Sequence, residues 1–183
     1  NVLNLGELCR DAGISLPTGK AYLSVLEATF LVSLLPPYAA GRTPRLVKSS
    51  KVYMSDSGIA AHLAGAGRLG QDFTAEPLAG ALLETHVLQN LRALLGTWCP
   101  GAGLYYWRIQ GRYEVDFVIE HKGRVLAVEV KWAGRIRERD IKALERFMAR
   151  VPGCDLAILA CNVDQATSLG KGIFAVPLGL VLA

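Results

Sequence analysis

Two runs of strand-forming residues meet at Lys122-Gly123, and this turn constrains the fold more than any other feature of the sequence. The runs on either side are rich in valine, leucine and isoleucine, so the pair predicts an antiparallel hairpin. Counting outward from the turn places Asp116 opposite Glu129. Lys131 shares their face because side chains alternate along a strand. The hairpin therefore predicts two carboxylates and a lysine on one face of a sheet.

The opposite face of the hairpin is apolar, and we assign it to the core. It consists of Val115, Phe117, Ile119, Leu126, Val128 and Val130. On the charged face the opposed carboxylates repel each other, and a divalent cation would remove that cost. Hard cations such as Mg²⁺ take carboxylate oxygens, waters and substrate phosphate as ligands. The alternative is a solvated face on which Lys131 simply neutralises Asp116 and Glu129.

A long helix predicted over 76–95 carries one acid inside its apolar stripe. Glu84 falls between Leu91 and Leu95 on the helical projection, on the side that packs inward. A carboxylate on a core face is costly unless it is paired or binds a metal. Glu84 therefore either reaches a buried basic partner or points at the same metal site as the hairpin. Taken with the hairpin, the residues favour a metal site.

The remaining pattern after residue 70 predicts a mixed sheet with helices packed on it. Further strands are expected over 104–109, 156–161 and 173–177, and an amphipathic helix over 137–150. The order α-β-β-β-α-β-β gives an α/β fold class. Basic residues on or just before the amphipathic helix either line a path for phosphates or belong to a solvated face interleaved with acids. They are Arg135, Arg137, Arg139 and Lys142.

The first 70 residues follow a helix, turn, helix, ribbon order, which is typical of a winged helix-turn-helix. Helices are predicted over 5–12 and 16–28, a short one over 57–63, and strands over 30–35 and 51–54. A basic loop joins the two strands. Its cations are Arg42, Arg45, Lys48 and Lys51. A glycine-rich stretch over 64–72 then marks a boundary, which gives two domains, 1–70 and 71–183.

The second of these helices is expected to turn its apolar side inward. That side holds Ala21, Tyr22, Val25 and Leu26. Its exposed side offers a single cation, Lys20, whereas recognition helices usually present more arginine, lysine, asparagine or glutamine to base edges. Three interpretations stay open for this unit: reading of a DNA sequence, contact of the basic loop with phosphates, or docking of a protein.

Composition narrows the class of protein. Apolar residues make up 51% of the 183 residues, which is enough for a packed core, and a net charge of +4 permits a nucleic-acid partner without demanding one. Prolines and glycines interrupt the longest uncharged stretches, so we expect no membrane span or signal peptide. Four cysteines without a CxxC pattern are expected to be free thiols in the cytoplasm. Because the chain does not begin with methionine, we expect it to be part of a longer protein.

The charged residues of the second unit resemble the PD-(D/E)XK nuclease superfamily. The matching residues are Glu84 on a helix, Glu114-Val115-Asp116 on a strand and Glu129-Val130-Lys131 on its neighbour, with Val115 in place of the usual proline. The resemblance implies a restriction-endonuclease-like α-β-β-β-α-β core. It also implies that Asp116, Glu129 and the carbonyl of Val130 bind Mg²⁺ or Mn²⁺. Lys131 would orient the attacking water, and Glu84 would support the site.

The order of motifs along the whole chain is similar to a family of prokaryotic AAA-type ATPases. In that family an ATPase module precedes a winged helix and a C-terminal domain of unknown function. The shared motifs are 48–58, Gly80-x-x-x-Glu84-Thr85-x-Val87, Tyr106-Trp107-Arg108, and the two carboxylate motifs above. The resemblance implies that this chain is the C-terminal part of such a protein, with ATP bound only in the other module.

Two functions follow from these patterns. The first is metal-dependent cleavage of DNA, and the second is a catalytically inactive module that couples an ATPase to DNA or to a protein partner. We expect the DNA contacts at Lys20, Arg42, Arg45, Lys48, Lys51, Arg108, Arg135 and Arg137. Arg108 either binds phosphate or pairs with Glu114. No membrane partner is expected.

Overall fold

The structure, a computed structural model, describes residues 2–39, 49–66, 77–109, 113–132 and 136–182. The N-terminal elements are α1 (Leu5–Asp11), α2 (Leu16–Ala28), β1 (Val32–Leu35), β2 (Lys51–Met54) and α3 (Ser57–Leu63). The later elements are α4 (Pro77–Trp98), β3 (Gly103–Ile109), β4 (Tyr113–His121), β5 (Arg124–Val130), α5 (Glu138–Met148), β6 (Leu156–Cys161), β7 (Thr167–Gly170), β8 (Ile173–Pro177) and α6 (Leu178–Val181).

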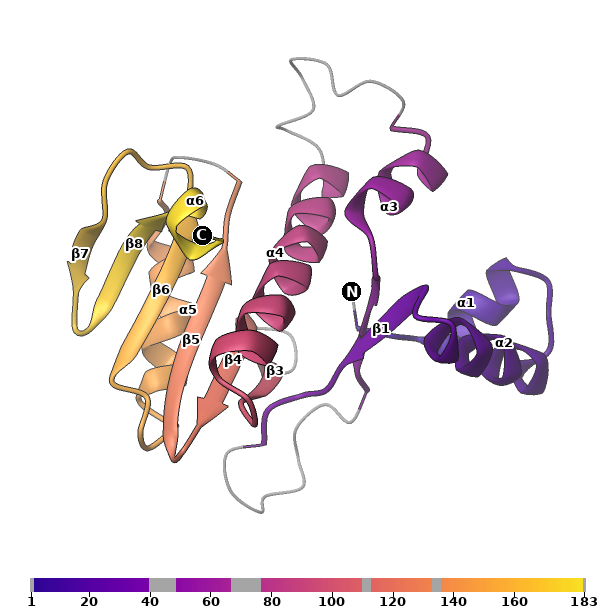
Figure 1. The fold of residues 1–183 in the computed structure, drawn as a ribbon, viewed down its shortest axis with the longest axis horizontal. Coiled ribbons are helices and arrows are strands. Elements are labelled where there is room, and N and C mark those ends of the chain that lie inside the picture. Colours follow the sequence, from indigo (N-terminus) through magenta and orange to yellow (C-terminus); the bar gives the residue numbers. More distant parts are fainter. Residues whose placement is uncertain (1, 40–48, 67–76, 110–112, 133–135, 183) are drawn as a thin grey trace.

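A six-stranded mixed sheet forms the larger part of the molecule (Figure 1). Its strand order is β3-β4-β5-β6-β8-β7. The first three strands are antiparallel, β6 and β8 run parallel to β5, and β7 is antiparallel to β8. Helix α5 connects β5 to β6, because parallel neighbours need a crossover connection. The element order α4-β3-β4-β5-α5-β6 confirms the predicted α/β class and the mixed sheet.

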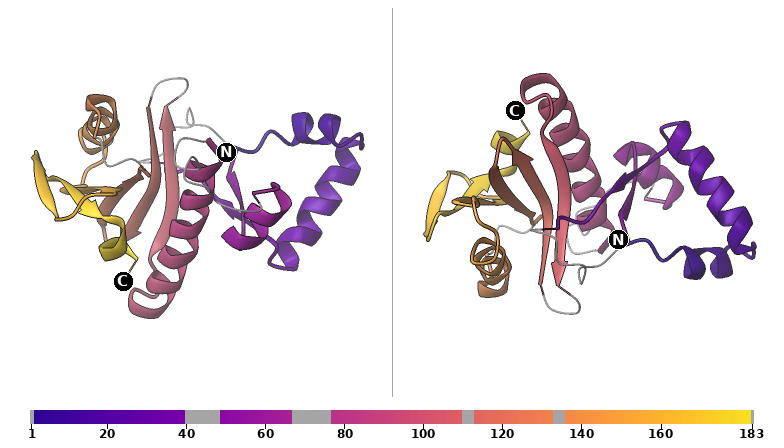
Figure 2. Two further views of the ribbon diagram at one scale, coloured as in Figure 1. Left: turned by 90° about the horizontal axis from the view of Figure 1, so that it is seen from above. Right: turned by 90° about the horizontal axis from the view of Figure 1, so that it is seen from below.

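Helices cover both faces of this sheet, with α4 on one side and α5 on the other (Figure 2). Val87 and Leu88 of α4 share a buried cluster with Phe117, Val128 and Val130. The cluster on the other face joins Leu144 and Phe147 of α5 to Val118, Ala127 and Leu159. Both faces of the central strands are therefore core, whereas the sequence predicted one apolar and one charged face.

The hairpin between β4 and β5 has the predicted register. Phe117 pairs with Val128 and His121 with Arg124, so Asp116 and Glu129 are the next residues outward. Lys122 and Gly123 have φ of +49° and +76°. Positive φ at both central residues is what a type I′ hairpin turn requires.

The pairing of β3 with β4 shifts register between Tyr105 and Trp107. Such a bulge interrupts the alternation of side chains along the strand. Val115 therefore packs in the α5-side cluster, not beside Phe117 as predicted.

The ribbon of β1 and β2 is part of the main body of the protein. Leu35 and Tyr53 belong to the buried cluster under α4. The segment after β1 runs along the edge strand β3, where the N–H of Tyr106 donates to the carbonyl of Pro36 and the N–H of Tyr38 donates to that of Tyr106. These contacts fix β2, and with it Lys51, against the sheet and α4.

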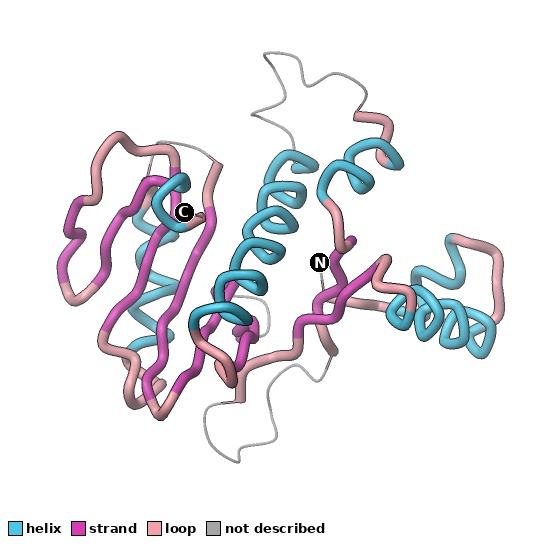
Figure 3. Tube along the Cα trace, viewed as in Figure 1, coloured by secondary structure: helices cyan, strands magenta, loops and turns pink. Residues whose placement is uncertain are grey.

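Helices α1 and α2 lie apart from the sheet (Figures 2 and 3). Gly19 of α2 packs on Cys9 of α1, but the apolar side of α2 is open. Tyr22 and Val25 are each 59% exposed and Leu26 is 38% exposed, and Ala21 is exposed as well. The prediction that this side faces inward is wrong, because nothing in the described part of the chain packs on it.

Two simpler expectations can also be compared with the structure. Cys9, Cys99, Cys154 and Cys161 are all free thiols, as the sequence predicted. Within the described ranges no helix combines the length and the apolar character that crossing a bilayer requires.

Candidate functional site

Lys51 lies at the centre of a cluster of carboxylates. Its ammonium nitrogen is 2.5 Å from an oxygen of Glu114, 3.2 Å from Asp116 and 3.5 Å from Glu84, and its side chain is only 2% exposed. The sequence placed Lys51 among the cations of the basic loop, at the start of the second strand, as a DNA contact. That prediction is wrong, because an ammonium enclosed by three acids cannot reach a DNA phosphate.

Alternation along β2 explains how a lysine becomes buried. Lys51 and Tyr53 face the core, whereas Val52 and Met54 are half-buried. The hydroxyl of Tyr53 donates a hydrogen bond of 3.2 Å to Glu84, and the Lys51 ammonium lies 5.5 Å from the centre of the Tyr106 ring. Glu84 on α4 thus reaches a buried basic partner, which is one of the two interpretations that the sequence left open.

Asp116 links this cluster to the neighbouring strand. One of its carboxylate oxygens contacts Lys51, and the other accepts the backbone N–H of Val130 at 3.1 Å. Its own N–H donates to the carboxylate of Glu129 at 3.3 Å. Side-chain hydrogen bonds therefore join β4 to β5 just beyond Phe117–Val128, the last pair of their ladder. The two carboxylate oxygens and the backbone N–H of Asp116 therefore each have a partner.

Glu129 and Lys131 form the second half of the site. The Lys131 ammonium is 2.6 Å from a Glu129 oxygen, and it is 38% exposed whereas Glu129 is buried. Val128 and Val130 pack on the α4 side, so the alternating Glu129 side chain lies on the α5 side. Glu84 and Glu129 therefore approach from opposite faces of the sheet, and Asp116 connects them.

The site holds more carboxyl groups than cations. Four carboxylates (Glu84, Glu114, Asp116 and Glu129) contact three cations (Lys51, Lys131 and Arg108). Burial, with a further contribution from Asp116, raises the pKa of Glu129 to about 8 and also raises the pKa of Glu84. Burial alone would lower the pKa of Lys51, but Asp116 and Glu84 outweigh it and the pKa is raised. Lys51 is therefore charged at neutral pH.

The donor chemistry of the site suits a hard cation, although its geometry offers few ligands. In the described part of the chain, no three His, Cys, Asp or Glu side chains are grouped to hold a metal ion. Asp116, Glu129 and the carbonyl of Val130 supply oxygen donors, and Mg²⁺ needs only one or two carboxylates because it keeps several waters. The carboxyl groups also outnumber the cations, which favours a further cation. Asp116 and Glu129 therefore suit a cation by their chemistry, and Lys51 already contacts one oxygen of Asp116.

Three of the remaining cations predicted to contact DNA lie in the described residues, and these three do not gather at one place. Lys20 is exposed on α2, away from the sheet, and Arg137 is exposed just before α5. Arg108 pairs with Glu114 at 3.4 Å, with its side chain 40% exposed. Arg42, Arg45, Lys48 and Arg135 lie outside the described residues.

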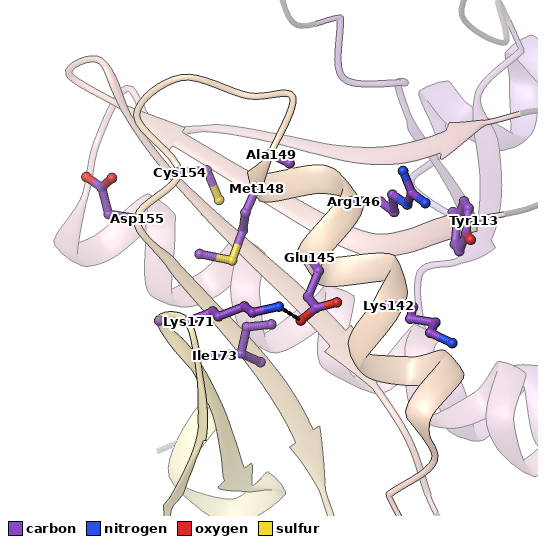
Figure 4. A pocket seen from close by; sticks show the side chains of 11 residues that line it. Tyr113, Lys142, Glu145, Arg146, Met148, Ala149, Cys154, Asp155, Lys171 and Ile173 are labelled. Carbon is purple, nitrogen blue, oxygen red and sulfur yellow. Dashed lines mark hydrogen bonds and ion pairs between the residues drawn. The ribbon is translucent and has the colours of Figure 1, made fainter.

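The outer side of α5 is a solvated face of paired charges. Lys142 contacts Glu138 at 2.8 Å, and Lys171, in the turn before β8, contacts Glu145 at 2.9 Å. A pocket of about 820 Å³ lies between α5 and that turn (Figure 4). Acidic and basic side chains both line it, and none of the carboxylates around Lys51 does. This agrees with the interleaved-charge interpretation of the helix.

Sequence reasoning missed the central role of Lys51 and the hydroxyl of Tyr53, and it named Glu114 only as an alternative partner of Arg108, a pair that the structure shows. A signal for the first two was present, since Lys51 and Tyr53 occupy alternate positions of a short apolar strand and so share its inward face. The neighbouring cations of the loop concealed it.

Comparisons with known proteins relate both parts of the chain to families without an assigned function. A family model described as a domain of unknown function (DUF4143) matches residues 79–181, more than half of the chain. This domain occurs in the C-terminal region of AAA-ATPase-like proteins. A second model, also described as a domain of unknown function (DUF8612), matches residues 1–70.

Two curated relatives are similar to this chain, one from Mycobacterium bovis and one from Mycobacterium tuberculosis, and both are described as uncharacterized proteins. Each is 36% identical over 126 residues, which is 68% of this chain. The match covers 27% of the length of each relative.

Proposed function

The chain belongs to the DUF4143 family of domains of unknown function, and on that premise we propose that it is a nuclease-like unit that binds DNA and hydrolyses its phosphodiester bonds. One observation carries this proposal. Glu84, Asp116, Glu129 and Lys131 lie in one connected network on an α-β-β-β-α-β arrangement. A helix Glu, a strand Asp and a Glu-x-Lys in that order are the set that resembles the PD-(D/E)XK nucleases.

Each residue has a distinct role in this proposal. Asp116, Glu129 and the Val130 carbonyl would hold Mg²⁺ or Mn²⁺, and the metal would neutralise charge on the phosphate and make water a better nucleophile. Lys131 is the exposed member, so its ammonium can orient the attacking water while Glu129 holds it in place. Glu84 supports the site indirectly, because it contacts Lys51 and Lys51 contacts Asp116.

The proposal also assigns partners. DNA phosphates would contact Lys20, Arg108, Arg135 and Arg137 together with the loop cations Arg42, Arg45 and Lys48. The N-terminal unit would act as a winged helix. The family's occurrence beside AAA-ATPase-like regions supports an ATPase module as a further partner within a longer protein, with ATP bound there. A cytoplasmic location agrees with a DNA substrate.

The test is incubation of the purified chain with supercoiled plasmid and excess Mn²⁺, with Lys131→Ala and Lys142→Ala beside the wild type. Lys142 is an exposed lysine paired with Glu138, so it is a matched control. We expect nicking by the wild type and by Lys142→Ala, and a loss of about 100-fold or more for Lys131→Ala. EDTA should abolish the cleavage. Wild-type cleavage no greater than in EDTA, or equal cleavage by Lys131→Ala, would contradict the proposal.

A second candidate function is a non-catalytic module that ties an ATPase to DNA or to a protein. The observation in its favour is the ammonium of Lys51 on Asp116, where a catalytic cation would bind. This candidate predicts salt-dependent DNA binding that survives Asp116→Asn. Each phosphate contact removed would lower the log-log salt slope by about 0.9. Binding without cleavage in the plasmid experiment would select it over the nuclease.

A further inference from the structure

Lys51 reaches the carboxylates from a different sheet than the one that contains β4. It comes from β2, whereas Asp116 and Glu114 belong to β4 and Glu84 to α4. Its ammonium contacts all three carboxylates, and the side chain is fully enclosed. A buried charge of this kind is held only because it is paired. Lys51 therefore acts as the cation that the three carboxylates require.

The position of this ammonium is fixed by backbone structure on both sides. Lys51 pairs with Leu35 of β1 and forms a bridge with Val2. Two residues earlier, the carbonyl of Ser49 accepts a hydrogen bond from the hydroxyl of Tyr106 on β3. The ribbon thus holds Lys51 against the site, and moving the ammonium away requires either a new side-chain conformation or movement of the ribbon.

A divalent cation at Asp116 would lie beside the ammonium of Lys51. Lys51 contacts one oxygen of the Asp116 carboxylate, and the other oxygen accepts the N–H of Val130. Two cations on one carboxylate repel each other, and the repulsion is stronger where burial limits screening by water, as at Asp116, whose side chain is 6% exposed. Lys51 and a divalent cation therefore exclude each other at Asp116.

We infer that Lys51 is a built-in competitor of the metal ion, so that the ammonium held by the β1–β2 ribbon opposes the binding of a divalent cation at Asp116. The inference rests on the proposed function in one respect, the choice of Asp116 and Glu129 as metal ligands. It adds a determinant of metal affinity to that site: the site binds metal weakly while the Lys51 ammonium contacts Asp116.

The test is calorimetric titration of the whole chain with Mn²⁺, together with thermal melting in EDTA and in Mn²⁺. Four proteins are compared: wild type, Lys51→Met, the double variant Lys51→Met/Asp116→Asn, and Lys171→Met. Lys171 contacts Glu145 on the surface and controls for the loss of any lysine ion pair. We expect Lys51→Met to bind Mn²⁺ about tenfold more tightly than the wild type, or better. The double variant should lose this gain, and Lys171→Met should match the wild type.

Equal Mn²⁺ affinity in the wild type and in Lys51→Met would overturn the inference, as would a gain that persists in the double variant. If Lys51→Met is unfolded in EDTA, Mn²⁺ should restore a cooperative melt, since the metal replaces the missing ammonium. Failure to restore it, in this variant and in Lys51→Gln, also overturns the inference.

Binding and cleavage separate this inference from the proposed function. Tighter Mn²⁺ binding by Lys51→Met without any DNA cleavage would leave the competition standing and remove the nuclease. DNA cleavage by the wild type, combined with unchanged Mn²⁺ affinity in Lys51→Met, would support the nuclease and overturn the competition between Lys51 and the metal ion.

Discussion

Lys51 and Lys171 both pair with glutamate, but their surroundings are opposite. The Lys51 side chain is 2% exposed and contacts three carboxylates, whereas Lys171 is 78% exposed and, among the described residues, contacts one carboxylate, Glu145. Water and salt screen the surface pair, so its net contribution to stability is small. Burial removes that screening and leaves each charge at the inner site dependent on its partners. The surface ion pair on α5 therefore contributes little to the free energy of unfolding, whereas the folded state depends on the buried ion pairs of Lys51.

The largest effect is expected when the same substitution is made at Lys51 and at Lys171. Lys51→Met leaves three carboxylates without their cation, and we expect a loss of roughly 3–5 kcal/mol in the free energy of unfolding in EDTA. Lys171→Met should change it by at most about 1 kcal/mol. Urea denaturation of the two variants beside the wild type measures both values. Similar losses in the two variants would show that burial does not distinguish the pairs.

The pH dependence of the free energy of unfolding tests the protonation of Glu129 in the buried site around Lys51. The pKa of Glu129 is raised to about 8 by burial and by Asp116, so the folded state holds a proton that the unfolded state releases near pH 4.5. The stabilisation that comes from this bound proton is fully present below pH 4.5 and is lost as the pH rises through about 8. The slope should be roughly 1 kcal/mol per pH unit over that range.

Glu129→Gln removes this titration while keeping a similar shape. Denaturation curves measured from pH 5 to pH 9 should therefore show a flatter profile for the variant than for the wild type. Glu145→Gln, at the surface pair, should leave the wild-type profile unchanged. Parallel profiles for wild type and Glu129→Gln would mean that Glu129 does not hold its proton in the folded state.

The smallest expected effect concerns a single hydrogen bond at the edge of the inner site. Tyr53→Phe removes the hydroxyl that donates to Glu84 but keeps the ring, which packs in the core under α4. Because Glu84 is 27% exposed, water can replace part of the bond, and we expect a loss of about 1 kcal/mol. Thermal or urea denaturation measures it. A loss as large as that of Lys51→Met would assign Tyr53, and not the lysine, the main role in holding Glu84.

Local patterns predicted those parts of the fold that neighbouring residues decide. The register of β4 and β5 follows from the turn at Lys122 and Gly123, since a two-residue hairpin loop leaves little choice of pairing. Helix α5 follows from its apolar stripe, in which Leu144 and Phe147 are buried. In contrast, the edge strand β7 was missed, because it is short, mostly exposed and interrupted by a register shift.

Other errors came from contacts that no local pattern contains. The sequence predicted an inward apolar side for α2, yet Tyr22 and Val25 are exposed, because helix periodicity identifies an apolar side without naming what covers it. The bulge opposite Tyr106 moved Val115 to the other cluster, and no residue preference marks that position. Coverage by α5 made core of the second face of the hairpin, which the sequence had assigned to a metal site or, as the alternative, to a solvated surface.

The sequence by itself determined the order of elements as far as β6, the α/β class, and the placement of Glu84 on the long helix and of Asp116, Glu129 and Lys131 on or next to the two hairpin strands. It could do so because periodicity and turn chemistry act over a few residues. Only the tertiary structure decided which cation these acids meet. Lys51 and Asp116 are 65 residues apart in the chain, and β2 brings them together through the packing of the ribbon against β3 and α4. Lys51, which the sequence groups with the cations of a loop, is therefore the buried centre of the site.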